Sequence, residues 1–90
     1  MKTYLDVLYE RIPEEIKQFV KKQGDIAIRI NKILRDKEIS SKEFAKKIGM
    51  KESQLNKIIR GDANPTLKTI TKIEAAIDFD IIVVPEYGDK

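Results

Sequence analysis

The sequence predicts one all-α domain: a bundle of about five short helices, preceded by a helical extension and followed by a single β-strand. Apolar residues recur at intervals of three and four along most of the 90 residues, which is the spacing of amphipathic helices. Ser, Thr, Gly and Pro divide these stretches into short segments. The exception is the run of β-branched residues at 81–84, ended by Pro85, which is typical of a strand. A chain of this length supports one small core.

Residues 1–23 form the predicted helical extension. Their apolar side chains fall at helical spacing in two stretches, Leu5, Leu8 and Ile12, then Ile16, Phe19 and Val20. Thr3 is a candidate N-cap for the first helix, and Pro13 suits the first turn of the second. Gly24 is predicted to end the second helix, because glycine readily adopts the left-handed conformation that follows many helices.

Residues 25–78 contain four further predicted helices. Asp25 is placed to cap the first, Ser40 and Glu43 form a capping box for the second, and Thr66 is placed to cap the last. Apolar residues at helical spacing give the expected buried faces: Ile26, Ile30, Ile33 and Leu34; Phe44, Ala45 and Ile48; Leu55, Ile58 and Ile59; and Leu67, Ile70, Ile73 and Ile77.

Gly49 interrupts a stretch that would otherwise suit one long helix. Glycine lets the chain turn sharply by adopting a left-handed φ, and the turn here is only about three residues long. Two short helices are therefore predicted to cross at a steep angle, with the small Ala45 allowing close packing. The outward face of the second helix is entirely polar, with Lys51, Glu52, Ser53, Gln54, Asn56, Lys57 and Arg60. This arrangement indicates a helix-turn-helix motif that presents its second helix to a polar partner.

Charge is distributed unevenly along the chain. Residues 24–73 carry twelve Lys and Arg against six Asp and Glu, a net charge of +6, whereas residues 74–90 carry one Lys and five acids, a net charge of −4. The asymmetry indicates that the middle of the chain meets an anion and that the tail does not. Taken alone, an ordinary solvated surface explains the same asymmetry equally well.

Composition excludes several kinds of chemistry. The chain has no cysteine and no histidine, so disulfides, thiolate nucleophiles and the common zinc sites are excluded. It has no glycine-rich phosphate loop and no carboxylate pair in an identifiable pocket. We therefore expect no catalytic residue, no metal ion and no cofactor, and a protein that is not an enzyme. Apolar runs fall short of the roughly 18 residues that cross a bilayer, and the N-terminus has acids where a signal peptide is apolar, so we expect a cytoplasmic protein without a membrane partner.

Residues 25–78 resemble the helix-turn-helix domain of the Cro and phage-repressor family, of the xenobiotic-response-element (XRE) type. The similarity lies in apolar Phe44, Ile48, Met50, Leu55 and Ile58, small Ala45, glycines at 49 and 61, and the segment NPTLKTITKIEAAI. It implies a lambda-repressor-like bundle that binds double-stranded DNA as a homodimer, with helix 51–60 in the major groove. It also implies a sequence-specific transcriptional regulator that acts as a repressor.

The resemblance further implies roles for individual residues. Base edges would be met by Lys51, Glu52, Ser53 and Lys57, with Gln54 and Asn56 nearby, and phosphates would be met by Ser41, Arg60 and Lys68. The residue types suit these roles, because lysine donates to guanine O6 and N7, glutamate accepts from cytosine N4, and serine can do either.

Two positions depart from the family pattern. Glu52 stands where a neutral glutamine is frequent, so its carboxylate must meet a cytosine or pair with a neighbouring lysine. Lys51 stands where a capping Ser or Thr is usual, so the second helix of the motif lacks its customary cap. A solvated face is the favoured interpretation for three other lysines, Lys42, Lys46 and Lys47.

The predicted strand at residues 79–85 has no partner strand within the chain. Strand backbone groups need hydrogen-bond partners, so we expect it to pair with its own copy or with a strand of another protein. Self-pairing would give a two-fold homodimer through Phe79, Ile81, Ile82, Val83 and Val84. The alternative is that residues 79–84 pack as extended coil on the N-terminal helices.

A helix-turn-helix domain with an extra N-terminal helical segment and a C-terminal strand also resembles antitoxins of bacterial toxin–antitoxin pairs, of the HigA and HipB kinds. That resemblance implies operator binding and neutralisation of a toxin protein. Residues 1–23 would then be a docking surface for the toxin; the alternative is that residues 16–23 complete the core.

Overall fold

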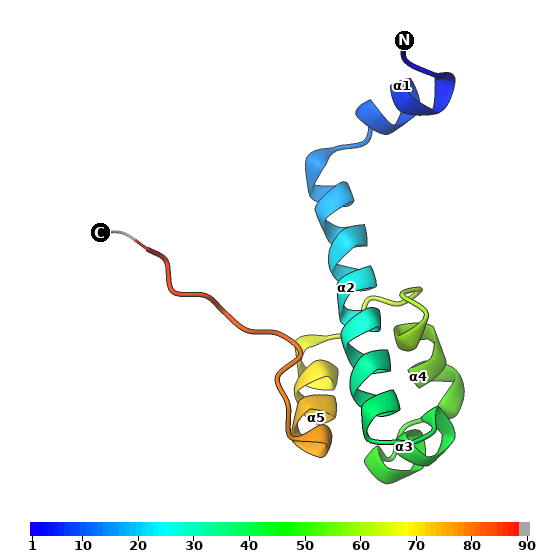
Figure 1. Ribbon diagram of the computed structural model, residues 1–90, viewed down its shortest axis with the longest axis vertical. Coiled ribbons are helices and arrows are strands. Elements are labelled where there is room, and N and C mark those ends of the chain that lie inside the picture. Colours follow the sequence, from blue (N-terminus) through cyan, green and yellow to red (C-terminus); the bar gives the residue numbers. More distant parts are fainter. Residues whose placement is uncertain (89–90) are drawn as a thin grey trace.

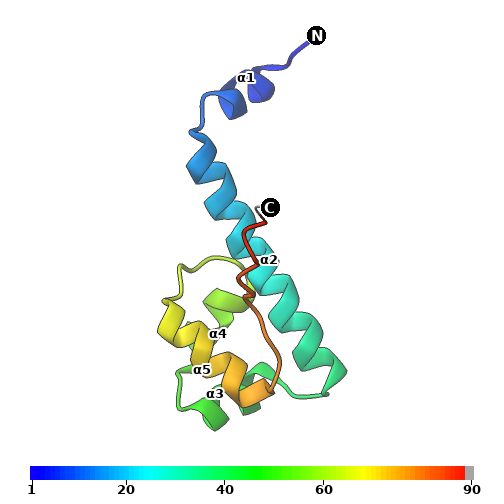
Figure 2. The ribbon, with the colours of Figure 1, turned by 90° about the vertical axis from the view of Figure 1, so that its left-hand side faces the viewer.

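The computed structural model describes residues 1–88, in which there are five helices and no strand (Figure 1). The helices are α1 (Tyr4–Glu10), α2 (Glu14–Asp36), α3 (Ser41–Ile48), α4 (Glu52–Ile59) and α5 (Leu67–Ile77). Figure 2 shows that α3, α4 and α5 lie on one side of α2, beside its C-terminal half. The N-terminal half of α2 and the whole of α1 project beyond this bundle (Figure 1). The helical bundle expected from the sequence is confirmed.

The core is formed by the apolar faces of α2, α3, α4 and α5. It contains Ile30, Ile33, Leu34, Phe44, Ala45, Ile48, Leu55, Ile58, Ile73 and Ile77. Nearly all of the expected inward positions are buried or partly buried. Leu67 is the exception, because its side chain is 70% exposed at the first turn of α5. Nine of these ten residues are Leu, Ile or Phe. Burial of each such side chain contributes roughly 1.5–3 kcal/mol to folding.

The predicted helix end at Gly24 is wrong, because Gly24 lies inside α2, which runs without a break for 23 residues in all. Asp25 is consequently not an N-cap but a mid-helix residue, whose carboxylate accepts a hydrogen bond of 2.8 Å from Lys21 Nζ. One internal glycine costs a helix only about 1 kcal/mol relative to alanine, which the packing of α2 against the bundle outweighs. Gly24 also lies beneath the turn at Gly61, where a Cβ on Gly61 would be 3.7 Å from Gly24 Cα.

The predicted caps are confirmed at three helix starts. Thr3 Oγ1 accepts a hydrogen bond of 3.1 Å from the Asp6 N–H at the start of α1. Ser40 and Glu43 form the expected reciprocal capping box, with distances of 3.1 and 3.2 Å between side-chain oxygen and backbone nitrogen. Thr66 caps α5 in the same way. Each cap satisfies an N–H group that has no partner within its own helix.

The predicted C-terminal strand is not seen, since residues 79–88 form no strand within this chain. Side chains of the bundle satisfy the first backbone groups of this tail instead. Glu74 Oε2 accepts hydrogen bonds from the N–H groups of Ile81 and Ile82 at 2.7 and 2.9 Å. Arg29 donates two hydrogen bonds to the Asp80 carbonyl oxygen, at 2.9 and 3.0 Å. The tail therefore needs no sheet to satisfy these groups, and it leaves the bundle as an extended segment (Figure 1).

The residues expected to form a dimer contact in the tail fall into two groups. Ile81 packs against the core, and the Phe79 ring lies 5.1 Å from Lys37 Nζ in a cation–π contact. The three that follow, Ile82, Val83 and Val84, are exposed. Their role in dimerisation stays a prediction. Among residues 1–88, no helix has both the length and the apolar character needed to cross a membrane.

Candidate nucleic-acid interface

The turn between α3 and α4 is made by Gly49. Its φ of 68° lies in the left-handed region, and no atom lies within 4 Å of the position that a Cβ would take, so backbone conformation rather than space requires glycine here. The next N–H, of Met50, donates a hydrogen bond of 2.9 Å to the Ala45 carbonyl oxygen and closes α3. The chain then enters α4 after Lys51. Two short helices joined by a tight turn are the predicted helix-turn-helix arrangement.

The α4 helix has one buried side and one exposed side. Leu55 and Ile58 are buried in the core, at 0% and 6% exposure. Of the residues predicted to read bases, five are exposed and one, Asn56, is half-buried. The exposed ones are Lys51, Glu52, Ser53, Gln54 and Lys57. The polar outer side of α4 is therefore uncovered by residues 1–88, and its orientation follows from the apolar anchors on its other side.

The start of α4 lacks a side-chain cap, as the sequence indicates. Lys51 has no acceptor atom, and the only partial substitute is Gln54, whose Oε1 accepts a hydrogen bond of 3.4 Å from the Lys51 N–H. Backbone N–H groups of the first turn therefore remain free to meet an anion. The Glu52 carboxylate forms no ion pair with a lysine within the described residues, so the expected pairing with a neighbouring lysine is not seen there.

The residues predicted to contact phosphate lie around α4 on three elements. Ser41 begins α3, Lys68 lies in the first turn of α5, and Arg60 follows the last residue of α4. Arg60 Nε lies 3.5 Å from Asp62 Oδ2 in an exposed ion pair. Such a pair contributes only about 0–1 kcal/mol, so it leaves the guanidinium available to another anion.

Comparison with known protein families matches residues 30–83 to the helix-turn-helix family HTH_3. The chain belongs to this helix-turn-helix family. Its membership supports a DNA-binding regulator, with DNA as the partner of the α3–α4 motif. The predicted resemblance to XRE-type proteins is confirmed. No curated protein and no solved structure matched the chain.

The family match spans the second part of α2, the helix-turn-helix motif, α5 and the start of the tail. Residues 1–29, which include α1 and the first turns of α2, lie outside it. The α3 lysines of this helix-turn-helix protein agree with the interpretation of a solvated face. Lys42, Lys46 and Lys47 are exposed, and Lys47 Nζ donates to the Ala76 carbonyl oxygen at 3.4 Å.

Two residues that hold the helix-turn-helix motif in place escaped prediction. Asn31 Nδ2 donates hydrogen bonds of 2.8 Å to the carbonyl oxygens of Ala27 and of Ile59, the last residue of α4. Gln23 Nε2 donates a hydrogen bond of 2.7 Å to the Ala63 carbonyl oxygen in the following loop. The two side chains thus attach the end of α4 and the loop after it to α2. One signal could have revealed Gln23: it is a polar residue at a position where the helical spacing of its neighbours calls for an apolar one.

Two groups in the N-terminal part of this helix-turn-helix protein have shifted pKa values. The backbone N–H and then the hydroxyl of Thr3 hold the pKa of Asp6 below its ordinary value. The hydrogen bond and the negative charge of Asp25 raise the pKa of Lys21.

Proposed function

We propose that this helix-turn-helix protein is a sequence-specific transcriptional repressor that binds double-stranded DNA as a homodimer, with α4 in the major groove. The observation that supports this best is the two-sided character of α4. Leu55 and Ile58 fix the helix on the core, while an uncovered row of polar side chains faces outward. A helix of this width fits the major groove of B-form DNA, where base edges present hydrogen-bonding groups.

Within this proposal, the residues of α4 divide the task of reading bases. Lys57 donates to guanine O6 and N7, and Glu52, which has no lysine partner among residues 1–88, accepts from cytosine N4. Lys51 and Ser53 contact neighbouring base edges near the start of the helix. Gln54 and the half-buried Asn56 flank these contacts. Our assignment predicts a G- and C-containing half-site.

Phosphate contacts position the protein without reading sequence. Ser41, Arg60 and Lys68 supply them from three different elements, and the uncapped N–H groups at the start of α4 add a favourable dipole. The protein acts in the cytoplasm. It binds its operator and so excludes other proteins that compete for the same DNA. It performs no catalysis and needs no cofactor.

Selection of bound duplexes from a random pool tests the function directly, because it reports both the preferred bases and the half-site spacing. A pool that yields no enriched sequence contradicts the proposal. Once a site is known, Lys57→Ala is expected to weaken binding by roughly 1–3 kcal/mol at one base pair and less at others. Arg60→Ala is expected to weaken all duplexes alike and to reduce the salt dependence by about one counterion.

Lys42→Ala is the matched control, since Lys42 is exposed on α3 and has no assigned DNA contact. It should change both affinity and salt dependence less than Arg60→Ala does. If Lys57→Ala and Arg60→Ala behave identically across sequences, the division into base-reading and phosphate-contacting residues is wrong.

A second candidate function is that of an antitoxin, which neutralises a toxin protein and represses its own operon. The observation that favours it is the exposed apolar surface of residues 4–20, which lies outside the family match. Co-purification of the chain with a protein encoded beside it supports this candidate if the complex dissociates when Leu5 and Leu8 are replaced by aspartate. An absence of any adjacent toxin gene contradicts it.

A further inference from the structure

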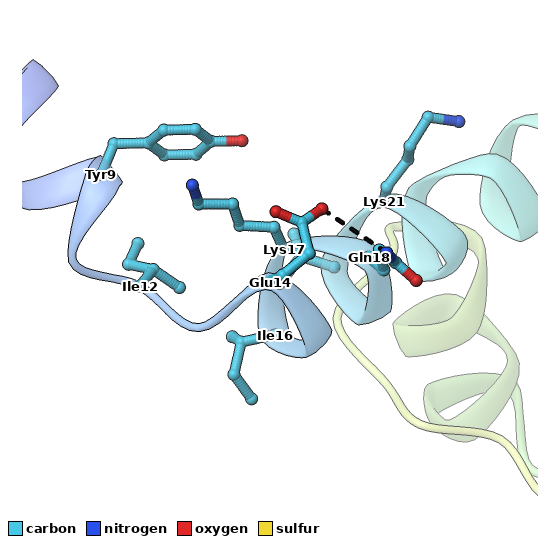
Figure 3. Close-up of a pocket in the computed structure, with 8 residues that line it drawn as sticks. Tyr9, Ile12, Glu14, Ile16, Lys17, Gln18 and Lys21 are labelled. Carbon is cyan, nitrogen blue, oxygen red and sulfur yellow. Dashed lines mark hydrogen bonds between the residues drawn. The ribbon is translucent and has the colours of Figure 1, made fainter.

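The N-terminal arm, defined as residues 4–22 (α1, the segment after it and the first part of α2), carries an apolar surface that residues 1–88 leave uncovered. Its exposed large apolar side chains are Tyr4, Leu5, Leu8, Tyr9, Ile12, Ile16, Phe19 and Val20. Figure 3 shows Ile12 on the segment that joins α1 to α2, Ile16 just after that segment, and Tyr9 and Lys17 facing each other. Lys17 Nζ lies 4.2 Å from the centre of the Tyr9 ring. Contiguous apolar surface of this kind marks an interaction site.

The apolar face of the arm continues a face that is already buried elsewhere on α2. Positions seven residues apart lie on the same face of a helix, and three such rows run along α2. In each row the first residue is in the arm and the last is in the core: Ile16, Gln23 and Ile30; Phe19, Ile26 and Ile33; Val20, Ala27 and Leu34. Ile30 is 0% exposed, whereas Ile16 is 45% exposed. The helix thus presents one packing surface of which only the C-terminal half is occupied within this chain.

The charges beside this face indicate what occupies the other half. Glu15 and Lys22 are seven residues apart and flank the apolar rows on the same side of α2. Against a parallel copy of the arm, Glu15 would lie beside Val20 and Lys22 beside Ala27, so neither charge would meet an opposite one. Against an antiparallel copy, Glu15 of each chain comes within reach of Lys22 of the other. The charges of two arms are therefore complementary when the arms pack antiparallel.

We propose that the N-terminal arm is the surface through which two copies of the chain associate, with the N-terminal halves of their α2 helices packed antiparallel. Ile16 of one copy lies level with Phe19 of the other, and two Glu15–Lys22 pairs border the contact. The α1 helices add Leu5 and Leu8 to the buried surface. The inference rests on the proposed function, since it names the partner surface of the homodimer. It leaves α4 uncovered, because α4 lies beside the other half of α2 (Figure 1).

Sedimentation of the full chain over a dilution series tests the interface, and charge exchange makes the test specific. Glu15→Lys and Lys22→Glu each replace two attractive pairs with two repulsive ones, so each is expected to raise the dimer dissociation constant about tenfold. The double variant, Glu15→Lys with Lys22→Glu, restores opposite charges and is expected to return the constant to its original range. All of these positions are exposed, so the circular dichroism spectrum should remain helical.

Two further variants serve as comparisons. Gln18→Lys alters an exposed position on the opposite side of α2 and should leave dimerisation unchanged. Val84→Asp alters the exposed end of the tail and should also leave it unchanged. If only Val84→Asp dissociates the dimer, the tail is the contact and the proposal is overturned. It is equally overturned if the wild-type chain stays monomeric at high micromolar concentration, or if the double variant is no better than the single ones.

The dimer is measured without DNA, so failure of the proposed interface can be distinguished from failure of the proposed function. A dimer that depends on Glu15 and Lys22 but enriches no duplex supports the interface and contradicts the DNA-binding assignment. A monomer that selects a specific half-site contradicts the interface and supports that assignment. In that case the arm is free to serve a different protein, as the antitoxin candidate requires.

Discussion

Asn31 on α2 donates a 2.8 Å hydrogen bond from its Nδ2 to the carbonyl oxygen of Ile59, the last residue of α4. That carbonyl belongs to the group of helix-end acceptors that have no partner within their own helix. The same amide nitrogen also donates to the Ala27 carbonyl oxygen one turn back on α2. A single side chain therefore connects the end of α4 to the longest helix of the bundle.

Replacement of Asn31 by alanine should loosen the end of α4. Loss of a hydrogen bond of this kind lowers the free energy of unfolding by about 1 kcal/mol. Because α4 as a whole becomes less well positioned, affinity should fall for every duplex without a change in base preference. Denaturant unfolding and DNA titration measure the two effects. Lys32→Ala is the control, since the exposed ion pair between Lys32 and Asp36 contributes little. An Asn31→Ala protein with unchanged stability and affinity would contradict the positioning role.

Gly24→Ala should stabilise the protein. Gly24 lies within α2, and an added Cβ would meet no atom within 4 Å. Alanine at a helical position is favoured over glycine by about 0.5–1 kcal/mol, so the denaturation midpoint should rise by the corresponding amount. Gly24→Pro should do the opposite, because proline interrupts a helix interior. Destabilisation by Gly24→Ala would mean that the chain bends at this residue after all.

Gly49→Ala should have the opposite sign, although it is the same chemical change. Gly49 has a φ of 68°, and a Cβ in the left-handed region costs roughly 1–2 kcal/mol. Asparagine tolerates that region better, so Gly49→Asn should lose less stability than Gly49→Ala. Thermal unfolding of the two variants provides the measurement. Equal losses in both would argue against backbone conformation as the reason for glycine in this turn.

Glu74→Ala should release the start of the tail. The Glu74 carboxylate accepts from the N–H groups of Ile81 and Ile82, so its removal should speed hydrogen exchange at these two amides by about tenfold or more. Glu74→Gln keeps one acceptor oxygen and should give an intermediate rate. Glu86→Ala, in the exposed tail, is the control and should leave both amides protected. Unchanged exchange in Glu74→Ala would show that another group holds the tail.

Features set by neighbouring residues were predictable from the sequence. The caps at Thr3, Ser40 and Thr66 depend on a partner three residues away, and the apolar faces depend on a helical period. The turn at Gly49 follows from its own φ. The polar face of α4 was predictable for the same reason, because it is read from consecutive residues.

Features that depend on distant residues were not predictable. Gly24 resembles a helix end in sequence, and only the packing of α2 against the bundle keeps the helix continuous there. The tail resembles a strand, but Arg29 binds its backbone from 51 residues away. Gln23 and Asn31 likewise have partners 40 and 28 residues away. No local pattern reports such contacts, so these residues were missed.

The unbroken α2 helix limits the spacing of operator half-sites that a dimer can bind. The α2 helix is unbroken over its 23 residues. In the proposed dimer, each bundle would therefore be held rigidly to its packed arm. The two α4 helices of such a dimer would keep one separation and one mutual angle. Inserting even a few base pairs between the two half-sites of a natural operator should therefore prevent the two subunits from binding both half-sites at once. The loss should be abrupt and not gradual.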